Sequence, residues 1–373
     1  MNPIELSKKL GGKIEVRSKM KLTEENLAVL YTPGVAEVCK AIAKDKKLSF
    51  EYTMRKNTIA VISDGSAVLG LGNIGPEAAL PVMEGKALLF KELGGVDAFP
   101  IVLNTQDTEE IIKTIKFLAP TFGGINLEDI CAPRCFEIEE RLKKELDIPV
   151  FHDDQHGTAI VVLAGIINAL KVAKKKLAKI KIVISGAGAA GVAIAKLLIK
   201  AGAKNILMLD SLGIIYKERA GGLNDSKMEI AKITNLKNLK GGLRDALAGV
   251  DVFIGVSAPN LLRSEDIKMM NEKAIVFAMA NPTPEIMPEE AKKGGAYIVA
   301  TGRSDYSNQI NNVLAFPGIF RGVLDNKIKK ITDKHKIKAA QAIAGLIKKP
   351  TCDKIIPRVL DKRVVKSVAG VFL

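Results

Sequence analysis

Apolar residues along this chain gather into short runs that alternate with stretches of helical periodicity. The first apolar runs have the length of buried strands and lie at 58–63, 98–104, 122–129 and 148–154. Residues 76–90 and 108–119 between them have helical character, and Pro76 suits the first position of a helix. This alternation predicts a parallel sheet with helices on its faces.

The second half of the chain repeats the alternation after a long apolar helix predicted over 158–174. Its predicted strands lie at 180–185, 205–210, 250–257, 274–281 and 296–302, and the segments between them are long enough for helical crossovers. The tail beyond about residue 325 is basic and predicted to be helical. We therefore predict an α/β fold of two domains, 1–157 and 158–373, with the boundary near 155–160.

Composition limits the classes of protein that fit. With 373 residues, 47% of them hydrophobic, the chain can fill two cores. Its net charge is +15, but the lysines are spread out and are not interleaved with aromatic residues, so we expect no nucleic-acid partner. The four cysteines are scattered, as in proteins of the reducing cytosol, and the N-terminus lacks the apolar core of a signal peptide. Since no apolar run approaches 18 residues, we expect no membrane span and a cytoplasmic location.

A glycine-rich string follows the strand predicted at 180–185 and opens an apolar helix. It matches the GxGxxG pattern and comprises Gly186, Gly188, Ala189, Ala190 and Gly191. In that context the glycines permit a tight turn, close approach of a pyrophosphate and packing of the helix on the sheet. The motif predicts a doubly wound, Rossmann-type NAD(P)-binding domain over 158–373, although a packing turn without a ligand would show the same string.

Asp210 closes the strand after this motif, at a spacing that suits the ribose 2′-hydroxyl of NAD. A carboxylate there repels the 2′-phosphate of NADP, so NAD is slightly favoured. Lys217 and Arg219 follow shortly and could bind that phosphate. The choice between NAD and NADP therefore stays open.

Acidic residues stand in pairs where two predicted strands end. The four acids are Glu128, Asp129, Asp153 and Asp154. Such a carboxylate cluster suits a hard cation, Mg²⁺ or Mn²⁺. The alternative is that the acids cap helices. His152 and His156 flank the second pair; either could ligate a metal or act as a base, but we favour a role in orienting their neighbours.

Several longer strings resemble one family over nearly the whole chain and in its order. They are YTPGVAEVC (31–39), SDGSAVLGLGNIGPEAALPVMEGKALLF (63–90), GGINLEDICAPRCFEIE (123–139), FHDDQHGTA (151–159), ANPTPEI (280–286) and ATGRSDYSNQINNVLAFPGIF (300–320). They look like the small malic enzymes of bacteria and archaea. The resemblance implies oxidative decarboxylation of L-malate to pyruvate and CO₂ with reduction of NAD(P), through metal-bound oxaloacetate and enolpyruvate.

The resemblance also assigns the proton-transfer residues. It implies that Lys86, in the EGKA motif, is the general base and that Tyr31, in the YTP motif, is the general acid. Asp153 would lie beside the lysine and help to set its charge state. From residue type alone, Lys86 would be a solvated helix lysine and Tyr31 a half-buried core residue.

The remaining implied roles are metal binding and substrate contact. The metal ligands implied by the LED and DDQ motifs are Glu128, Asp129 and Asp154, and the ion would act as a Lewis acid. Asn281 and Asn312 match positions that contact the substrate or the nicotinamide end of the cofactor. The first domain would thus be the substrate and metal domain.

One departure from the larger malic enzymes affects the substrate site. They carry an arginine that grips a substrate carboxylate where this chain has Ala67. Another cation must therefore hold that carboxylate, and a partner subunit is one source because the family implies a homodimer. Two alternatives stay open for the activity: a hydroxy-acid dehydrogenase that does not decarboxylate, and a non-catalytic dinucleotide sensor.

Overall fold

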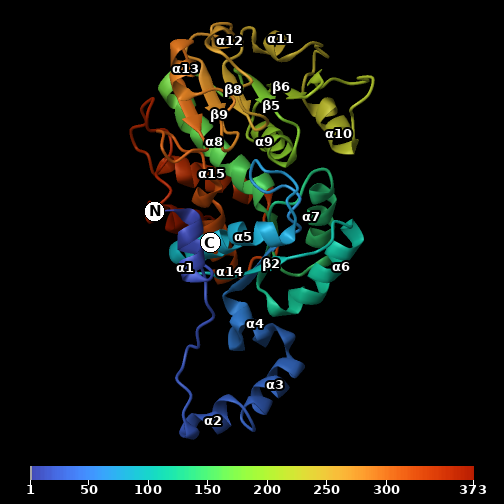
Figure 1. Ribbon diagram of the computed structural model, residues 1–373, viewed down its shortest axis with the longest axis vertical. Coiled ribbons are helices and arrows are strands. Elements are labelled where there is room, and N and C mark those ends of the chain that lie inside the picture. The colour runs from blue at the N-terminus through green and yellow to red at the C-terminus, as the bar shows by residue number, and fades with distance from the viewer. Residues whose placement is uncertain (1) are drawn as a thin grey trace.

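The computed structural model describes residues 2–373 and contains two α/β units stacked end to end (Figure 1). The first is a four-stranded parallel sheet in the order β2-β1-β3-β4. Its strands are β1 (Thr58–Ser63), β2 (Asp97–Val102), β3 (Gly124–Leu127) and β4 (Val150–His152). Its helices are α5 (Pro76–Gly94), α6 (Thr108–Leu118) and α7 (Arg134–Glu145). All residues of β1 are buried, as expected for a parallel strand covered on both faces.

The second unit is a six-stranded sheet in the order β10-β9-β8-β5-β6-β7, parallel except for the edge strand β7. Its strands are β5 (Lys181–Ser185), β6 (Asn205–Asp210), β7 (Gly213–Ile214), β8 (Val252–Gly255), β9 (Ile275–Ala278) and β10 (Ile298–Thr301). Its helices are α9 (Ala189–Lys200), α10 (Asp225–Ile233), α11 (Leu243–Leu247), α12 (Ser264–Ile267) and α13 (Pro288–Lys293). The order reverses between β5 and β8, where doubly wound sheets bind ligands.

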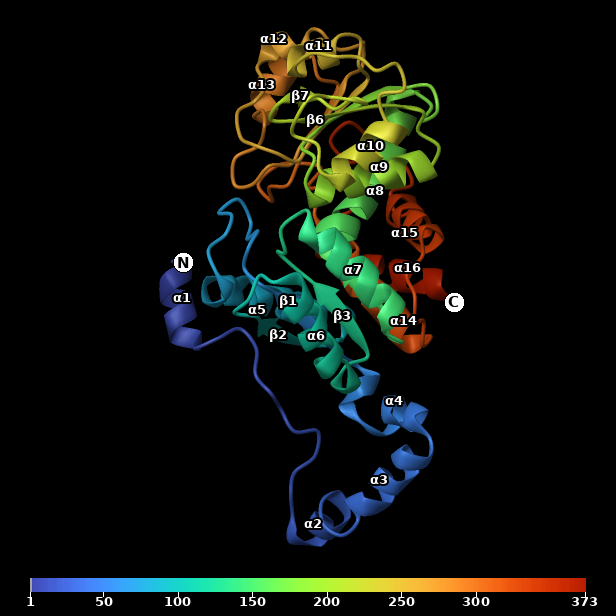
Figure 2. The same cartoon turned by 90° about the vertical axis from the view of Figure 1, so that its right-hand side faces the viewer.

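Helices from the middle and the end of the chain join the two units. They are α8 (Asp153–Ala173), α14 (Phe316–Asp325), α15 (Asp333–Gly345) and α16 (Arg363–Ala369). The Phe316 ring lies 4.6 Å from that of Phe90 on α5, so the end of the chain returns to the first unit, as Figure 2 shows. By length and composition α8 could cross a membrane, but 72% of its most apolar window is buried, which identifies it as a core helix.

An N-terminal arm extends from the first unit (Figure 2). It carries α1 (Pro3–Leu10), α2 (Glu24–Leu30), α3 (Val35–Lys44) and α4 (Ser49–Tyr52). Every residue of α2 and α3 is at least partly exposed. Apolar side chains on this arm therefore lack a core within the single chain, and their exposed fractions include 71% for Val29 and 68% for Tyr31.

The predicted α/β class is confirmed, and the main differences lie at element ends. The helix predicted from residue 158 begins at Asp153, so the second acidic pair lies in its first turn, where the helix dipole favours negative charge. The helix predicted over 76–90 continues to Gly94. The edge strand β7 was not predicted because two residues are too few to show a pattern.

Candidate active site

Lys86 lies in a buried ionic group at the carboxyl edge of the first sheet. Lys86 belongs to α5, and its Nζ lies 2.5 Å from Asp153 Oδ2 and 2.8 Å from Glu128 Oε1. All three side chains are less than one-tenth exposed. The Asn312 amide, from the second unit, donates to the same Asp153 oxygen over 2.5 Å. The structure therefore brings together the predicted base, its predicted acidic neighbour and one predicted substrate contact.

The three predicted metal ligands form a compact cluster beside this lysine. Glu128, Asp129 and Asp154 each offer a carboxylate oxygen, and these oxygens lie within 4.8 Å of one another. Asp154 Oδ2 also accepts a hydrogen bond of 2.8 Å from the backbone N–H of Asp129. Asp129 has a φ of 54°, a left-handed conformation that is rare for a residue with a side chain and marks a locally constrained backbone.

Burial and like charge perturb the titration of these groups. Burial, reinforced by the charge of Asp154, raises the pKa of Asp129 to about 8. Burial also raises the pKa of Glu128 well above its usual range, against the opposing charge of Lys86. For Lys86, burial favours the neutral form, but the charges of Asp153 and Glu128 outweigh it and raise the lysine pKa.

This arrangement fits a divalent cation. Within residues 2–373, Asp129 Oδ2 and Asp153 Oδ1 are buried but have no hydrogen-bond partner. Buried carboxylates are costly unless a cation or hydrogen-bond donors compensate them. Three clustered oxygen donors suit Mg²⁺ or Mn²⁺, and Glu128, Asp129 and Asp154 are the residues that would hold the ion.

A second buried ionic network supports the start of α8 and was not predicted. Glu139 on α7 is 4% exposed, and its Oε1 accepts a 3.0 Å hydrogen bond from the backbone N–H of His152. Its Oε2 lies 2.8 Å from His156 Nε2, and Lys143 Nζ lies 2.6 Å from Oε1. Glu139 thereby holds His152 and His156, the residues on both sides of the second acidic pair. The sequence signal was an acid among the apolar, buried positions of an amphipathic helix.

Asn281 lies where the two units meet. A Cβ at Gly70 would come 2.0 Å from the Asn281 carbonyl oxygen, so the loop after β1 packs directly against the segment after β9. A Cβ at Gly302 would lie 2.9 Å from Asn281 Nδ2. The Asn281 side chain thus packs against Gly302, just after the end of β10.

Tyr31 is not brought to this site within the single chain. It directly follows α2 on the extended arm and is 68% exposed, and α2 lies well away from α5 (Figure 2). Its role as the general acid stays a prediction that requires another copy of the chain or a movement of the arm.

The glycine-rich turn has the geometry that a dinucleotide requires. Gly186 has a φ of 116°, and a Cβ there would lie 2.5 Å from the Val256 carbonyl oxygen. A Cβ at Gly191 would come 1.8 Å from the Gly186 carbonyl oxygen, so helix α9 packs tightly on its own turn. A Cβ at Gly188 would point into open space, where a pyrophosphate could approach the free N–H groups at the start of α9. Ala189 and Ala190 form the first turn of that helix.

Asp210 is not a free carboxylate. Arg219 donates to both of its oxygens, at 2.9 and 2.6 Å, and Lys227 Nζ lies 2.7 Å from Oδ2. Although burial opposes it, hydrogen bonds from these two cations lower the pKa of Asp210 to about 2. The prediction missed Lys227, which lies on α10, 17 residues after Asp210. Two cations against one acid give the ribose end of the cleft a net positive charge.

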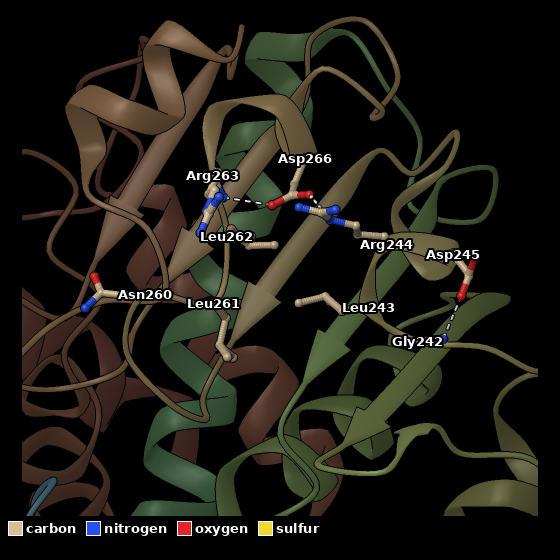
Figure 3. Close-up of a pocket in the computed structure, with 9 residues that line it drawn as sticks. All are labelled: Gly242, Leu243, Arg244, Asp245, Asn260, Leu261, Leu262, Arg263 and Asp266. Carbon is tan, nitrogen blue, oxygen red and sulfur yellow. Dashed lines mark hydrogen bonds and ion pairs between the residues drawn. The ribbon is translucent and has the colours of Figure 1, made fainter.

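A cleft of about 820 Å³ runs past the glycine-rich turn and Asp210. Its lining includes Gly186, Gly188, Asp210 and Lys227. Ala132, from the first unit, also lines it, so the cleft extends to the loop after β3 that carries Asp129. A second cavity of about 510 Å³ continues beyond it (Figure 3). The two cavities share the wall residues Gly242, Leu243 and Leu261. Together the two cavities are large enough for an extended dinucleotide, and the walls of the second are mixed, with charged side chains such as Arg244 and Asp266 beside Leu243.

Comparison with known proteins agrees with this geometry. The family model "Malic enzyme, N-terminal domain" matches residues 11–143, and "Malic enzyme, NAD binding domain" matches residues 155–370. The chain is 57% identical over 361 residues to the bifunctional malic/malolactic enzyme of Bacillus subtilis, covering 96% of this chain and 88% of that protein. It is 58% identical over 362 residues to the NAD-dependent malic enzyme of Geobacillus stearothermophilus, covering 96% and 75%.

A solved structure with the same fold is the NAD-dependent malic enzyme of Thermotoga maritima. It matches with a TM-score of 0.97 at 51% identity, covering 100% of this chain and 99% of that chain. Relatives named NADP-dependent malic enzymes match as well. The similarity extends over both units and the helices between them.

Proposed function

This chain belongs to the malic enzyme family, and we propose that it oxidises L-malate to pyruvate and CO₂ while reducing a nicotinamide dinucleotide. The observation that carries the proposal is the buried pair of Lys86 and Asp153 beside three clustered carboxylates. A dehydrogenase that does not decarboxylate, or a dinucleotide sensor, would have no use for this cluster.

Different residues of the chain have different roles in the proposed reaction. When bound, a divalent ion held by the Glu128 cluster would supply Lewis acidity and the dinucleotide would accept a hydride. Lys86 Nζ, once neutral, would take the proton of the substrate hydroxyl. Asp153 orients that nitrogen from 2.5 Å, and Asn312 holds Asp153 in place. The burial of Lys86 and Asp153 excludes water from the proton transfer.

We also propose that the enzyme is a homodimer in which Tyr31 serves the active site of the partner subunit. The extended arm, the exposed apolar residues of α2 and α3, and the 68% exposure of Tyr31 support this arrangement. A tyrosine placed there would protonate the carbon that loses CO₂.

Mixing two inactive variants tests the shared site. Tyr31→Phe and Lys86→Ala subunits, unfolded and refolded together, should regain about a quarter of the wild-type rate, because half the dimers are mixed and each has one intact site. No recovery from mixed dimers of verified composition would show that Tyr31 acts within its own chain.

For the cofactor, we propose that the cleft accepts NADP as well as NAD. The initial preference for NAD assumed a free Asp210 carboxylate, whereas Arg219 and Lys227 both pair with it. Lys227 also lines the cleft and could bind a 2′-phosphate directly. Lys227→Gln should raise KM for NADP about tenfold and leave KM for NAD within about twofold. Equal effects on both cofactors would contradict this assignment.

The activity itself is tested by absorbance at 340 nm with L-malate and Mn²⁺, in parallel with NAD and NADP. Pyruvate is measured separately, and EDTA provides the metal-free control. We expect equal amounts of pyruvate and reduced cofactor and no reaction with EDTA. Reduced cofactor without pyruvate would favour the non-decarboxylating dehydrogenase, and cofactor binding without turnover would favour the sensor.

We further propose a cytoplasmic location. The four cysteines are free thiols, which suits a reducing compartment. Cell fractionation with an antibody to the protein tests this, and recovery in the membrane or extracellular fraction would contradict it.

A further inference from the structure

The active site holds more negative than positive charge. Four carboxylates, those of Glu128, Asp129, Asp153 and Asp154, surround the single ammonium of Lys86. With a divalent cation bound and all four carboxylates ionised, the excess is one negative charge while Lys86 is protonated and two once Lys86 is neutral. A dicarboxylate substrate adds two more, and its carboxylate remote from the cation needs a positive partner. Ala67 cannot supply one.

Two nearby cations are already committed to buried acids. Arg134 Nη2 lies 2.8 Å from Asp64 Oδ2, and the Asp64 side chain is completely buried. Turning Arg134 toward a substrate would leave that acid buried without compensation, which is strongly unfavourable. Lys86 is held in the same way by two buried carboxylates.

Arg303 differs because its ionic partner is exposed to solvent. Its Nε and Nη2 lie 2.9 and 2.6 Å from the two oxygens of Asp305, whose side chain is 54% exposed. Solvent-exposed ion pairs contribute little stability, so Arg303 can exchange Asp305 for another carboxylate at small cost. Its guanidinium fork matches the geometry of a carboxylate.

Arg303 also lies close to the contact between the two units. It follows β10 directly, and its Nη1 donates to the Pro282 carbonyl oxygen at 3.4 Å. The neighbouring Asn281 is pressed against the first-unit loop at Gly70. The guanidinium is therefore anchored on the segment of the second unit that packs against the loop after β1.

We propose that Arg303 binds the substrate carboxylate remote from the metal cluster, releasing Asp305 as the substrate enters. The proposal rests on the proposed function, since it assumes a dicarboxylate substrate. Arg303 would thus determine which dicarboxylates the enzyme accepts. Its guanidinium, from the second unit, would add a positive charge to a site whose acids come from the first sheet and α8.

The test compares Arg303→Gln with Arg363→Gln. Arg363 is a matched control because it forms the same kind of local forked pair, with Asp361, on the far C-terminal helix. KM for L-malate should rise about tenfold or more in Arg303→Gln and stay within about twofold of wild type in the control. Inhibition by oxalate, which can chelate the metal but lacks the remote carboxylate, should change less than about twofold in both.

Each other outcome has a defined meaning. An unchanged KM for malate would overturn the proposal, and so would an equal loss of malate and oxalate affinity, which would show that Arg303 only supports the metal site. Asp305→Asn provides a second variant if Arg303→Gln fails to fold. It should keep or lower KM for malate, because the acid that competes for Arg303 is gone. A tenfold rise in KM would contradict the proposal that Arg303 exchanges Asp305 for the substrate. If wild-type protein makes no pyruvate from malate, the proposed function fails instead.

Discussion

Replacing Lys86 with alanine tests the chemistry and the charge balance of the site together. A general base contributes roughly 10²–10⁴ in rate, so turnover should fall at least a hundredfold. The same change leaves Asp153, which is 0% exposed, and Glu128, which is 4% exposed, without their cation. Breaking a buried ion pair by removing one partner costs about 3–5 kcal/mol. In a domain of this size that corresponds to a fall in melting temperature on the order of 10 °C.

The assay combines turnover at 340 nm with thermal unfolding, in EDTA and in excess Mn²⁺. Lys91→Ala is the control, because Lys91 lies on the same helix but forms an exposed pair with Asp97. Such a pair contributes about 0–1 kcal/mol, so both readouts should stay near wild type. Mn²⁺ should stabilise Lys86→Ala, since a cation at 100 times its Kd adds about 2.7 kcal/mol to the folded state.

Two results would refute this reasoning separately. If Lys86→Ala retains more than about a tenth of wild-type turnover, the loss is far below that expected for a general base, and the lysine is not the base. If its melting temperature in EDTA equals that of the wild type, the lysine does not compensate the buried acids. Dinucleotide binding should persist in either case, because the glycine-rich turn belongs to the other unit.

Three further predictions concern separate parts of the molecule. Gly191→Ala should weaken dinucleotide binding at least about tenfold by calorimetry, because its Cβ would collide with the Gly186 carbonyl oxygen at 1.8 Å; unchanged affinity would show that α9 can shift freely. Iodoacetamide at pH 8 should spare Cys135, because its burial raises the thiol pKa above its usual range; alkylation of Cys135 in the folded protein, detected by peptide mass mapping, would contradict this. The pKa of Asp210 is lowered to about 2, so it contributes stability above its unfolded pKa of about 4 and loses it as pH falls toward 2. Acid unfolding of Asp210→Asn should lack this loss of stability. If the variant and the wild type unfold at the same pH, the ion pairs of Asp210 do not contribute to stability.

Much of the fold could be predicted because parallel strands are continuous apolar runs. Every strand of the first sheet overlaps a predicted segment, with β2 starting one residue early, and five strands of the second sheet fall within theirs. The start of α8 could not be placed, because the apolar run begins at Ala159 whereas the helix begins at Asp153, six residues earlier. Polar residues in a helical first turn carry no hydrophobic pattern, so only the structure shows that the acids project from a helix rather than end a strand.

The site was predictable where a motif fixes local geometry and not where distant segments meet. The glycine-rich turn needed only its own spacing, and its packing follows from the sequence. The pairing of Asp210 with Lys227 depends on how α10 folds back on β6, and nothing in the spacing indicates it. The exposure of Tyr31 was likewise outside the reach of the sequence, because it depends on the path of the arm.

The position of Glu128 explains how a lysine with a raised pKa can act as a base. The same carboxylate lies 2.8 Å from Lys86 Nζ and belongs to the three-carboxylate cluster. One carboxylate cannot neutralise two cations fully. When Glu128 binds a metal ion, it therefore stabilises the charged form of Lys86 less. The pKa of Lys86 should therefore fall when the cluster is loaded, and Asp153, still 2.5 Å away, would orient the neutral amine. Lys86 would thus become a base only after the metal has bound, which keeps a charged and well-paired lysine in the resting protein.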